Sequence, residues 1–301
     1  MHRSATLRIS GALLLLLLLR PATTGAWGFW SHRQIHQHAI RSLPEGMTPF
    51  FTAHADTLMA WSVDPDQRRF SDSTEGPKHY IDIDRYGARP FAALPRSRAE
   101  ANRLYGRVTV DTNGTVPWVI AELTDSLADA MRRKNGLSIL RIAADLGHYV
   151  ADAHVPLHAT SNYDGQWTGQ KGLHARWESR LPERFGASYR LQPEAFTPIT
   201  DPLAEAFRIV LESELLVDSV VTLDMAARAG IPEDQLMRKR ERRGRVETEF
   251  APEFYNRYHA LLKGMVERRL QASIGSVAGF WAAAWFNAGQ PNLASVRVAW
   301  N

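Results

Sequence analysis

The sequence predicts an all-α fold, a single-domain multi-helix bundle. Two observations carry this prediction: apolar residues recur at helical spacing along nearly the whole chain, and alternating apolar and polar patterns are scarce. The best alternating stretch, from Arg107 to Asp111, is short. Beyond residue 26 there is no internal repeat, low-complexity tract or linker rich in Pro, Gly or Ser. We therefore expect one domain over residues 27–301.

The most informative predicted helix lies in the middle of the chain. The stretch from Leu137 to Ala153 is apolar on nearly every side, which is typical of a helix buried inside a bundle, and Pro156 ends it. The other helices are indicated by capping residues and by Pro near their first positions. Their expected starts are near Ser31, Thr48, Pro117, Asp201 and Pro252, the last helix having a candidate break near Gly275.

Residues 1–26 have the composition of a secretory signal peptide. Two arginines precede an unbroken leucine run from Leu13 to Leu19, and small and polar residues follow as far as Ala26. The apolar run is about half of the ~20 residues that a membrane span requires, so a retained anchor is the weaker alternative. We expect cleavage after Ala26 and a secreted or periplasmic product, with no transmembrane anchor after cleavage.

Charge says little about partners. Removing residues 1–26 leaves 33 basic and 32 acidic residues. One local basic run remains, because six of the eight residues from 238 to 245 are Arg or Lys. Such a run is most often a solvated helix end or loop, with contact to nucleic acid or anionic lipid as the alternative.

Histidine is abundant and cysteine is absent. An exported chain without disulfides needs another source of rigidity, and bound metal supplies one because ligand binding free energy becomes folding free energy. The chain has 11 histidines and no cysteine. A metal site built from nitrogen and oxygen ligands is therefore a hypothesis to test against the positions of the histidines.

Two pairs of histidine and carboxylate side chains have helical spacing. His148 and Asp152 are four residues apart in the buried central helix, and His174 and Glu178 repeat the spacing. His158 follows just after Pro156, where a turn can bring it back towards the first pair. One such pair is more often a structural hydrogen bond, but two pairs with a third histidine suit zinc.

Two upstream residues add ligands of the same types. Asp64 precedes Pro65, and His79 precedes Tyr80. Each has an ordinary explanation, since Asp before Pro is common in turns and a lone His beside Tyr is often a hydrogen-bonded core residue.

The pattern resembles the superfamily of zinc-dependent phospholipases C and S1/P1 nucleases, and the resemblance spans most of the chain from Trp27 onwards. Its most specific part is His148-x3-Asp152-x5-His158 followed by His174-x3-Glu178. The resemblance implies a helical bundle with a cleft that binds three zinc ions (Zn2+). The implied ligands are Asp64, His79, His148 and Asp152 for one ion; His158, His174 and Glu178 for the second; and His32, Asp152 and the amino nitrogen and carbonyl oxygen of Trp27 for the third.

The third implied ion links the metal site to cleavage of the signal peptide. An acylated amide nitrogen is a poor zinc ligand, whereas a free α-amine is a good one once it is deprotonated. Cleavage after Ala26 would therefore complete this site. The alternative is that Trp27 merely begins a segment that packs against the helices.

The resemblance also implies the chemistry, a secreted zinc-dependent hydrolysis of phosphodiesters. Asp64 is the expected catalytic residue, orienting or deprotonating the attacking water. Tyr80 and Asp82, which follow His79, are the expected substrate-binding residues, able to stack on and hydrogen-bond a base. The expected partner is a phosphodiester substrate, namely single-stranded nucleic acid, nucleotides or phospholipid headgroups, and no protein partner is implied.

The substrate class stays open at this point. Glu178, where the nucleases usually carry Asp, and the short spacer before His174 resemble the phospholipases, whereas His32 five residues after Trp27 resembles the nucleases. We favour an S1/P1-type nuclease or 3′-nucleotidase over a phospholipase C. A protein in which zinc is only a structural staple is the remaining alternative, although structural zinc sites are usually closed and rich in Cys.

Overall fold

The structure is a computed structural model that describes residues 27–192, 196, 198–242 and 245–300. The predicted signal peptide, residues 1–26, lies outside the described residues. The all-α prediction is confirmed, since helices make up most of the described chain and its strands form one short hairpin. In the first half the helices are α1 (Phe29–Ile40), α2 (Thr48–Ala53), α3 (Ala55–Trp61), α4 (Asp64–Arg68), η1 (Gly76–Lys78), η2 (Ile83–Tyr86), α5 (Arg98–Tyr105), α6 (Arg107–Thr112), α7 (Val116–Arg132) and α8 (Gly136–Ala153).

The second half carries the remaining helices and the two strands. They are η3 (Pro156–His158), α9 (Leu173–Ala175), η4 (Arg176–Arg180), α10 (Leu181–Phe185), η5 (Gly186–Ser188), α11 (Pro202–Glu214), α12 (Val217–Arg228), α13 (Glu233–Leu236), β1 (Met237–Arg242), β2 (Arg245–Phe250), α14 (Pro252–Leu261) and α15 (Met265–Asn287). The η4 segment is a π-helical turn, and the other η segments are 3₁₀ turns.

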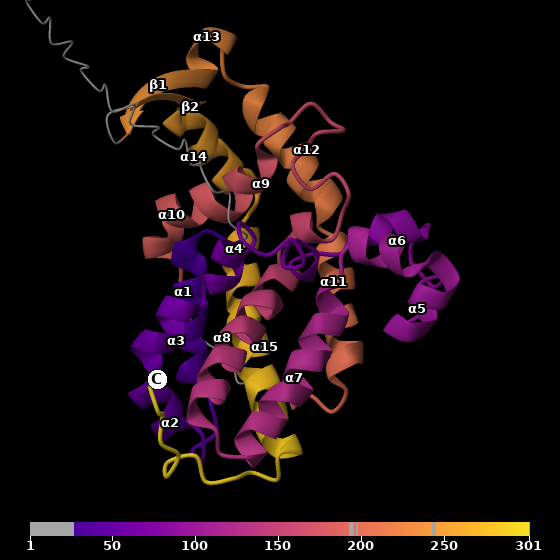
Figure 1. The fold of residues 1–301 in the computed structure, drawn as a ribbon. Coiled ribbons are helices and arrows are strands. Elements are labelled where there is room, and N and C mark those ends of the chain that lie inside the picture. The colour runs from indigo at the N-terminus through magenta and orange to yellow at the C-terminus, as the bar shows by residue number, and fades with distance from the viewer. Residues whose placement is uncertain (1–26, 193–195, 197, 243–244, 301) are drawn as a thin grey trace, which may run out of the picture.

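Helix α8 lies in the middle of the bundle, as its apolar sequence predicts. It packs against α7, α15, α3 and α1, and Figure 1 shows α7 and α15 running beside it. The helix begins where the side chain of Asn135 accepts a hydrogen bond of 3.1 Å from the backbone N–H of Ser138. Nearly every side chain from Leu146 to Ala153 is buried. Polar side chains on this helix therefore need partners inside the protein.

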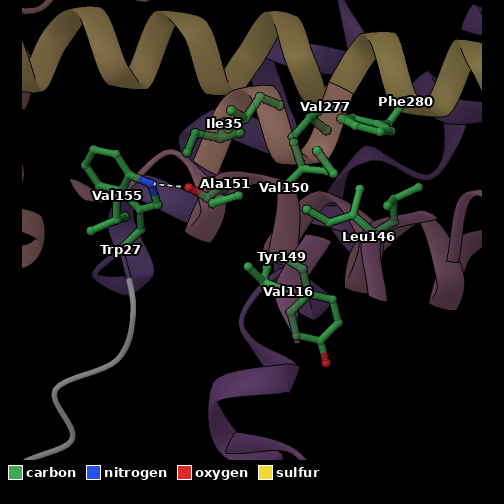
Figure 2. Close-up of a cluster of buried hydrophobic side chains, with 14 of the residues drawn as sticks. Trp27, Ile35, Val116, Leu146, Tyr149, Val150, Ala151, Val155, Val277 and Phe280 are labelled. Carbon is green, nitrogen blue, oxygen red and sulfur yellow. Dashed lines mark hydrogen bonds between the residues drawn. The ribbon is translucent and has the colours of Figure 1, made fainter. Parts of the chain in front are cut away.

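The buried apolar side chains form one continuous cluster that runs from Trp27 to Val296. Figure 2 shows the part around α8, where Val150 and Leu146 lie beside Val277 and Phe280 of α15. Trp27 closes one end of this cluster, and its indole N–H donates a 2.7 Å hydrogen bond to the carbonyl of Ala151. The core thus holds the end of α8 against the first described residue. No helix in the described ranges is both long and apolar enough to cross a bilayer.

One local prediction is wrong, and the most strand-like pattern in the sequence forms a helix. The alternating stretch from Arg107 to Asp111 is helix α6, in which Arg107 Nε lies 3.4 Å from Asp111 Oδ2 one turn away. The described part of the basic run, 238–242 and 245, is not a helix end or loop: it lies in β1 and β2, which pair antiparallel, with Arg238 opposite Glu249.

The last helix also differs from its prediction. The predicted helix is interrupted at Gly264, which has a positive φ of 76°, and α15 continues through Gly275. A glycine with a positive φ ends one helix and starts the next because no Cβ opposes that conformation.

Candidate metal centre

Helix α8 presents His148 and Asp152 on one face. Both side chains are fully buried, and Nε2 of His148 lies 3.2 Å from Oδ2 of Asp152. The Nδ1–H of His148 donates a 2.8 Å hydrogen bond to the carbonyl of Ser62, so Nε2 is the nitrogen that faces Asp152. Burial alone lowers the pKa of His148, but the Asp152 carboxylate outweighs it and raises the pKa to about 9.

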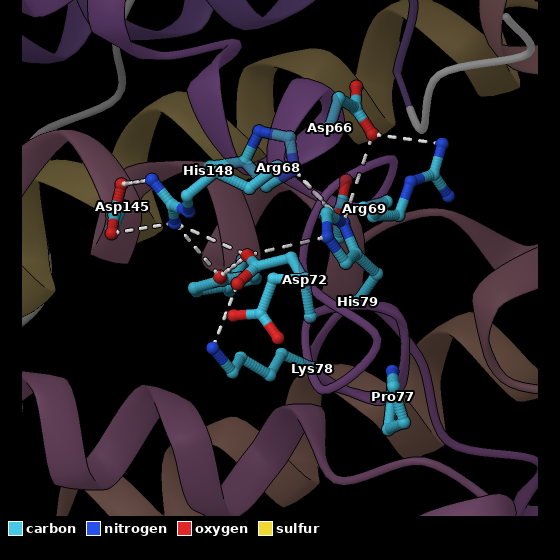
Figure 3. A network of polar contacts seen from close by, with 12 residues as sticks. Asp66, Arg68, Arg69, Asp72, Pro77, Lys78, His79, Asp145 and His148 are labelled. Atoms are coloured by element: carbon cyan, nitrogen blue, oxygen red, sulfur yellow. Dashed lines mark hydrogen bonds and ion pairs between the residues drawn. The ribbon is translucent and has the colours of Figure 1, made fainter.

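His79 completes a first group with this pair. Its Nδ1 lies 2.9 Å from Oδ2 of Asp152 and 3.1 Å from Nε2 of His148. His79 follows the η1 turn, so a loop residue meets the central helix here (Figure 3). Burial lowers the pKa of His79 to about 4, which leaves its ring neutral at pH 7 and able to offer a lone pair.

A second group consists of His32, Asp66 and His148, whose candidate ligand atoms all lie within 4.8 Å of one another. The His32 ring comes from α1 and stacks on the His148 ring at 4.0 Å between centroids. Nε2 of His32 is also 3.4 Å from Oδ1 of Asp152. The two groups share His148, and Asp152 reaches both. The predicted bridging position of Asp152 is therefore compatible with this geometry.

The structure brings Asp66 into this centre, and it does not bring Asp64. Asp66 is buried, neither carboxylate oxygen has a hydrogen-bond partner, and Arg69 Nη2 lies 3.3 Å from Oδ1. Burial raises the pKa of Asp66 to about 6. Asp64 starts the same five-residue helix, and residues two positions apart point about 200° away from each other around a helix axis. Burial raises the pKa of Asp64 too. The charges that affect this pKa most are those of Arg68 and Asp145.

The third group consists of His158, His174 and Glu178. Nε2 of His174 lies 3.1 Å from Glu178 Oε1 and 3.2 Å from Nε2 of His158, and His158 Nε2 is 3.4 Å from Glu178 Oε2. Neither Glu178 oxygen has a hydrogen-bond partner, although the side chain is fully buried. Glu178 lies in the π-helical turn η4, a conformation often found at functional sites.

Backbone carbonyls hold both histidines of the third group. The Nδ1–H of His158 donates to the carbonyl of His79 at 2.5 Å, and that of His174 donates to the carbonyl of Tyr163 at 3.2 Å. In each ring the Nε2 atom is thereby left to face Glu178. The first of these bonds also fixes the third group directly against the first.

Trp27 lies between the groups. Its indole is hydrogen-bonded to Ala151, its ring centroid is 5.2 Å from that of Trp177, and the N–H of Gly28 donates to the carbonyl of Glu178 at 3.3 Å. The start of the described chain is therefore adjacent to Ala151, which precedes Asp152, and to Trp177 and Glu178. Its role as a ligand stays a prediction.

The predicted substrate-binding residues flank the centre. Ile81, between them, donates its N–H to the carbonyl of His158 at 2.9 Å. The Tyr80 hydroxyl donates to the carbonyl of Thr112, and Oδ2 of Asp82 lies 3.1 Å from Nε of Arg85. Burial raises the pKa of Asp82 to about 6. Both residues thus lie beside His79 and His158, and their contact with substrate stays a prediction.

The residues present fit divalent metal ions. Imidazole nitrogens and carboxylate oxygens are the donor types that zinc accepts, and sulfur donors are not needed. Buried carboxylate oxygens without hydrogen-bond partners are costly unless a cation compensates them, and Asp66, Asp152 and Glu178 all provide such atoms. A cavity of about 670 Å³ is lined by residues that include Glu75 and Tyr149, and none of the predicted ligands lines it.

Comparisons with known proteins give a fold likeness of limited strength. No protein-family model matches the chain, and no curated protein sequence matches it. One matching solved structure is the crystal structure of alpha-toxin from an avian strain of Clostridium perfringens, which is 12% identical, covers 86% of this chain and superposes with a TM-score of 0.49. This chain spans 64% of the length of that structure. At this similarity the match gives no information on activity.

Proposed function

We propose that the protein is a zinc-dependent phosphodiester hydrolase. The observation that supports this proposal most is the convergence of three groups of histidine and carboxylate side chains from α1, α4, the end of η1, α8, η3, α9 and η4. Each group includes a buried carboxylate oxygen without a hydrogen-bond partner. These are the positions that the sequence resemblance implies, except that Asp66 takes the place of Asp64. Residues of a structural staple would be expected to form one closed site, not three adjoining groups.

The proposed ligands follow from the groups. Asp66, His79, His148 and Asp152 would hold one ion, and His158, His174 and Glu178 a second. The third would be held by His32, Asp152 and the amino nitrogen and carbonyl oxygen of Trp27. When bound, zinc supplies Lewis acidity that activates water and offsets charge on the phosphate.

The chain's own residues account for the rest of the proposed reaction. His32 and His79 are neutral at pH 7, since burial lowers the pKa of each to about 4. Asp66 takes the role first expected of Asp64: its buried carboxylate lies with His32 and His148, 3.3 Å from Arg69, and there it can orient the attacking water. Tyr80 and Asp82 lie at the edge of the centre and would bind the part of the substrate that flanks the phosphate.

For the substrate we put phospholipid first, since no contact among the described residues favours a nuclease. The loop that carries Tyr163, whose ring centroid is 6.1 Å from that of His174, also carries Trp167, and these side chains are 52% and 69% exposed. Gln170 of this loop donates to the carbonyl of Val221 in α12, where Met225 is also exposed. Exposed aromatic and aliphatic side chains together suit a lipid surface better than a base-stacking platform.

The test has two stages. Elemental analysis and turnover of a chromogenic phosphodiester, with and without chelator, test the reaction class. No zinc-dependent turnover on any phosphodiester would support the structural-staple alternative. Phosphatidylcholine vesicles, single-stranded DNA and a 3′-nucleotide, compared at equal enzyme concentration, then test the substrate class. Preference for either nucleic-acid substrate would restore the nuclease interpretation.

A further inference from the structure

Glu75 is a buried charged residue that the sequence interpretation passed over. Its side chain is 1% exposed, and it lies four residues before His79 at the start of η1. One carboxylate oxygen, Oε1, accepts hydrogen bonds from Arg68 Nη2 at 3.2 Å and from the hydroxyl of Tyr149. The other, Oε2, accepts one of 2.8 Å from Nζ of Lys78. A carboxylate with three such donors is held in one orientation.

Each of these donors lies within two residues of a candidate ligand in sequence. Arg68 lies two residues after Asp66, and Tyr149 directly follows His148. Lys78 directly precedes His79. The guanidinium of Arg68 is itself fixed by Asp145 of α8, at 2.8 Å and 3.1 Å. Glu75 thus joins the three chain segments that bring Asp66, His79 and His148 together. Figure 3 shows Arg68 and Lys78 in this network.

His79 faces the centre with its Nδ1 atom, whereas three other candidate ligand histidines face it with Nε2. In His148, His158 and His174 the Nδ1–H donates to a backbone carbonyl, and Nε2 faces the centre. In His79 the Nδ1 atom faces Asp152 and His148, and Nε2 is 3.7 Å from Oε1 of Glu75. This Nε2 atom is buried and has no hydrogen-bond partner, and the Glu75 carboxylate lies on the side where the other rings have a carbonyl.

We propose that Glu75 is a positioning residue: when metal is bound, its carboxylate closes the 3.7 Å separation from Nε2 of His79, accepts a hydrogen bond from the Nε2–H and thereby keeps the Nδ1 lone pair directed at the metal. This inference rests on the proposed function, because it assumes that His79 is a ligand. A neutral imidazole carries one ring proton, so a fixed acceptor on one side decides which nitrogen is free on the other. Carboxylates in this position orient metal-bound histidines in other proteins, and their loss weakens metal affinity about 10- to 100-fold.

The direct test is Glu75→Gln, which keeps the shape and removes the charge. Zinc affinity, measured by competition with a chromophoric chelator, should fall about 10- to 100-fold at one site and stay unchanged at the others. Asp72→Asn is the matched control, since Asp72 is an acid in the same segment whose hydrogen bonds go to Thr74. The control should bind zinc as the unaltered protein does.

A spectroscopic readout separates positioning from general support of the fold. In the zinc-loaded protein, the Nε2 proton of His79 should give a downfield NMR signal that exchanges slowly with water. In Glu75→Gln this signal should move upfield and exchange faster, because an amide oxygen is the weaker acceptor. Unchanged zinc affinity together with an unchanged His79 signal would overturn the inference.

Tyr149→Phe keeps the test decisive if Glu75→Gln does not fold. This variant removes one donor to Glu75 and leaves the aromatic ring in place, so it should reduce zinc affinity at the same site by a smaller factor. Affinity and His79 signal equal to those of the unaltered protein would overturn the inference. If the unaltered protein bound no zinc at all, the proposed function itself would fail, which distinguishes the two outcomes.

Discussion

The indole N–H of Trp27 donates a 2.7 Å hydrogen bond to the carbonyl of Ala151, the residue before Asp152. Trp27 is fully buried, and its other ring contact is Trp177, the residue before Glu178. The beginning of the described chain is therefore fixed against two of the segments that carry a candidate carboxylate ligand, those of Asp152 and Glu178. This arrangement limits how far the backbone of Trp27 can move relative to Asp152.

The first prediction concerns the start of the mature chain. Adding one glycine before Trp27 converts its amine into an amide, so the protein should lose one zinc and keep the other two. Elemental analysis of two forms released from a fusion, one starting at Trp27 and one at the added glycine, would measure this. The melting temperature of the metal-free forms is the control, and equal zinc content in both forms would contradict the proposal for Trp27.

The second prediction separates the two aspartates of α4. Asp66→Asn should lower zinc affinity and reduce turnover of a phosphodiester by a factor of at least about 100, because it removes a charged ligand of the centre. Asp64→Asn, two residues away on the opposite side of the helix, should bind zinc normally and keep most of its activity. Metal content and kcat/KM of both purified variants decide this. The reverse order of effects would return the role to Asp64.

The pairs at helical spacing could be predicted from sequence alone. His148 with Asp152 and His174 with Glu178 need only one turn of helix to meet, and the structure brings each pair within 3.2 Å. The choice between Asp64 and Asp66 could not be made this way. Both lie in a five-residue helix with Pro at its second position, and its rotation is set by packing against α8.

The contacts of Glu75 and the strands of the basic run could not be predicted from sequence for other physical reasons. The contact of Glu75 with Tyr149 joins residues 74 positions apart, so no local pattern reports it. The basic run lacks the apolar alternation that marks a strand. Its hairpin is supported by pairs across the strands, such as Arg238 with Glu249 at 2.7 Å. Tertiary contacts decide such segments, and local periodicity does not.

The third prediction concerns the proton that zinc displaces from His148. In the metal-free protein the Asp152 carboxylate overcomes the effect of burial and raises the pKa of His148 to about 9, so this ring is protonated at pH 7.5. Zinc must displace that proton from His148. His79, with a pKa of about 4, is already neutral at pH 7.5 and releases no proton when zinc binds. Zinc affinity should therefore increase about tenfold per pH unit between pH 7 and 9 for one displaced proton.

Calorimetry in two buffers with different ionisation enthalpies would count the protons released at pH 7.5. The same shift affects the stability of the metal-free protein. The folded pKa of His148 is above its ordinary value of 6.5, so its contribution is complete below pH 6.5 and is lost as pH rises through 9. Zinc binding without proton release would contradict the placement of His148 beside Asp152.

The fourth prediction concerns the packing behind the centre. A Cβ on Gly147 would lie too close to Nε2 of His36, and that ring lies between the carbonyls of His32 and Ala144, at 2.9 Å and 3.1 Å, and donates to one of them. The ring cannot move aside without breaking these contacts. Gly147→Ala should therefore destabilise the metal-free protein by about 1–3 kcal/mol, as overpacking does elsewhere.

Gly275→Ala is the matched control for this substitution. Gly275 is also inside a helix, but nothing lies within 4 Å of its added Cβ. Alanine there should stabilise the protein by about 0.5–1 kcal/mol, because glycine is the poorer helix former. Thermal unfolding of both metal-free variants tests the pair. Because His36 contacts the backbone of His32, Gly147→Ala should also weaken zinc binding at the His32 group, and an unchanged zinc affinity would show that α1 adjusts without moving that ligand.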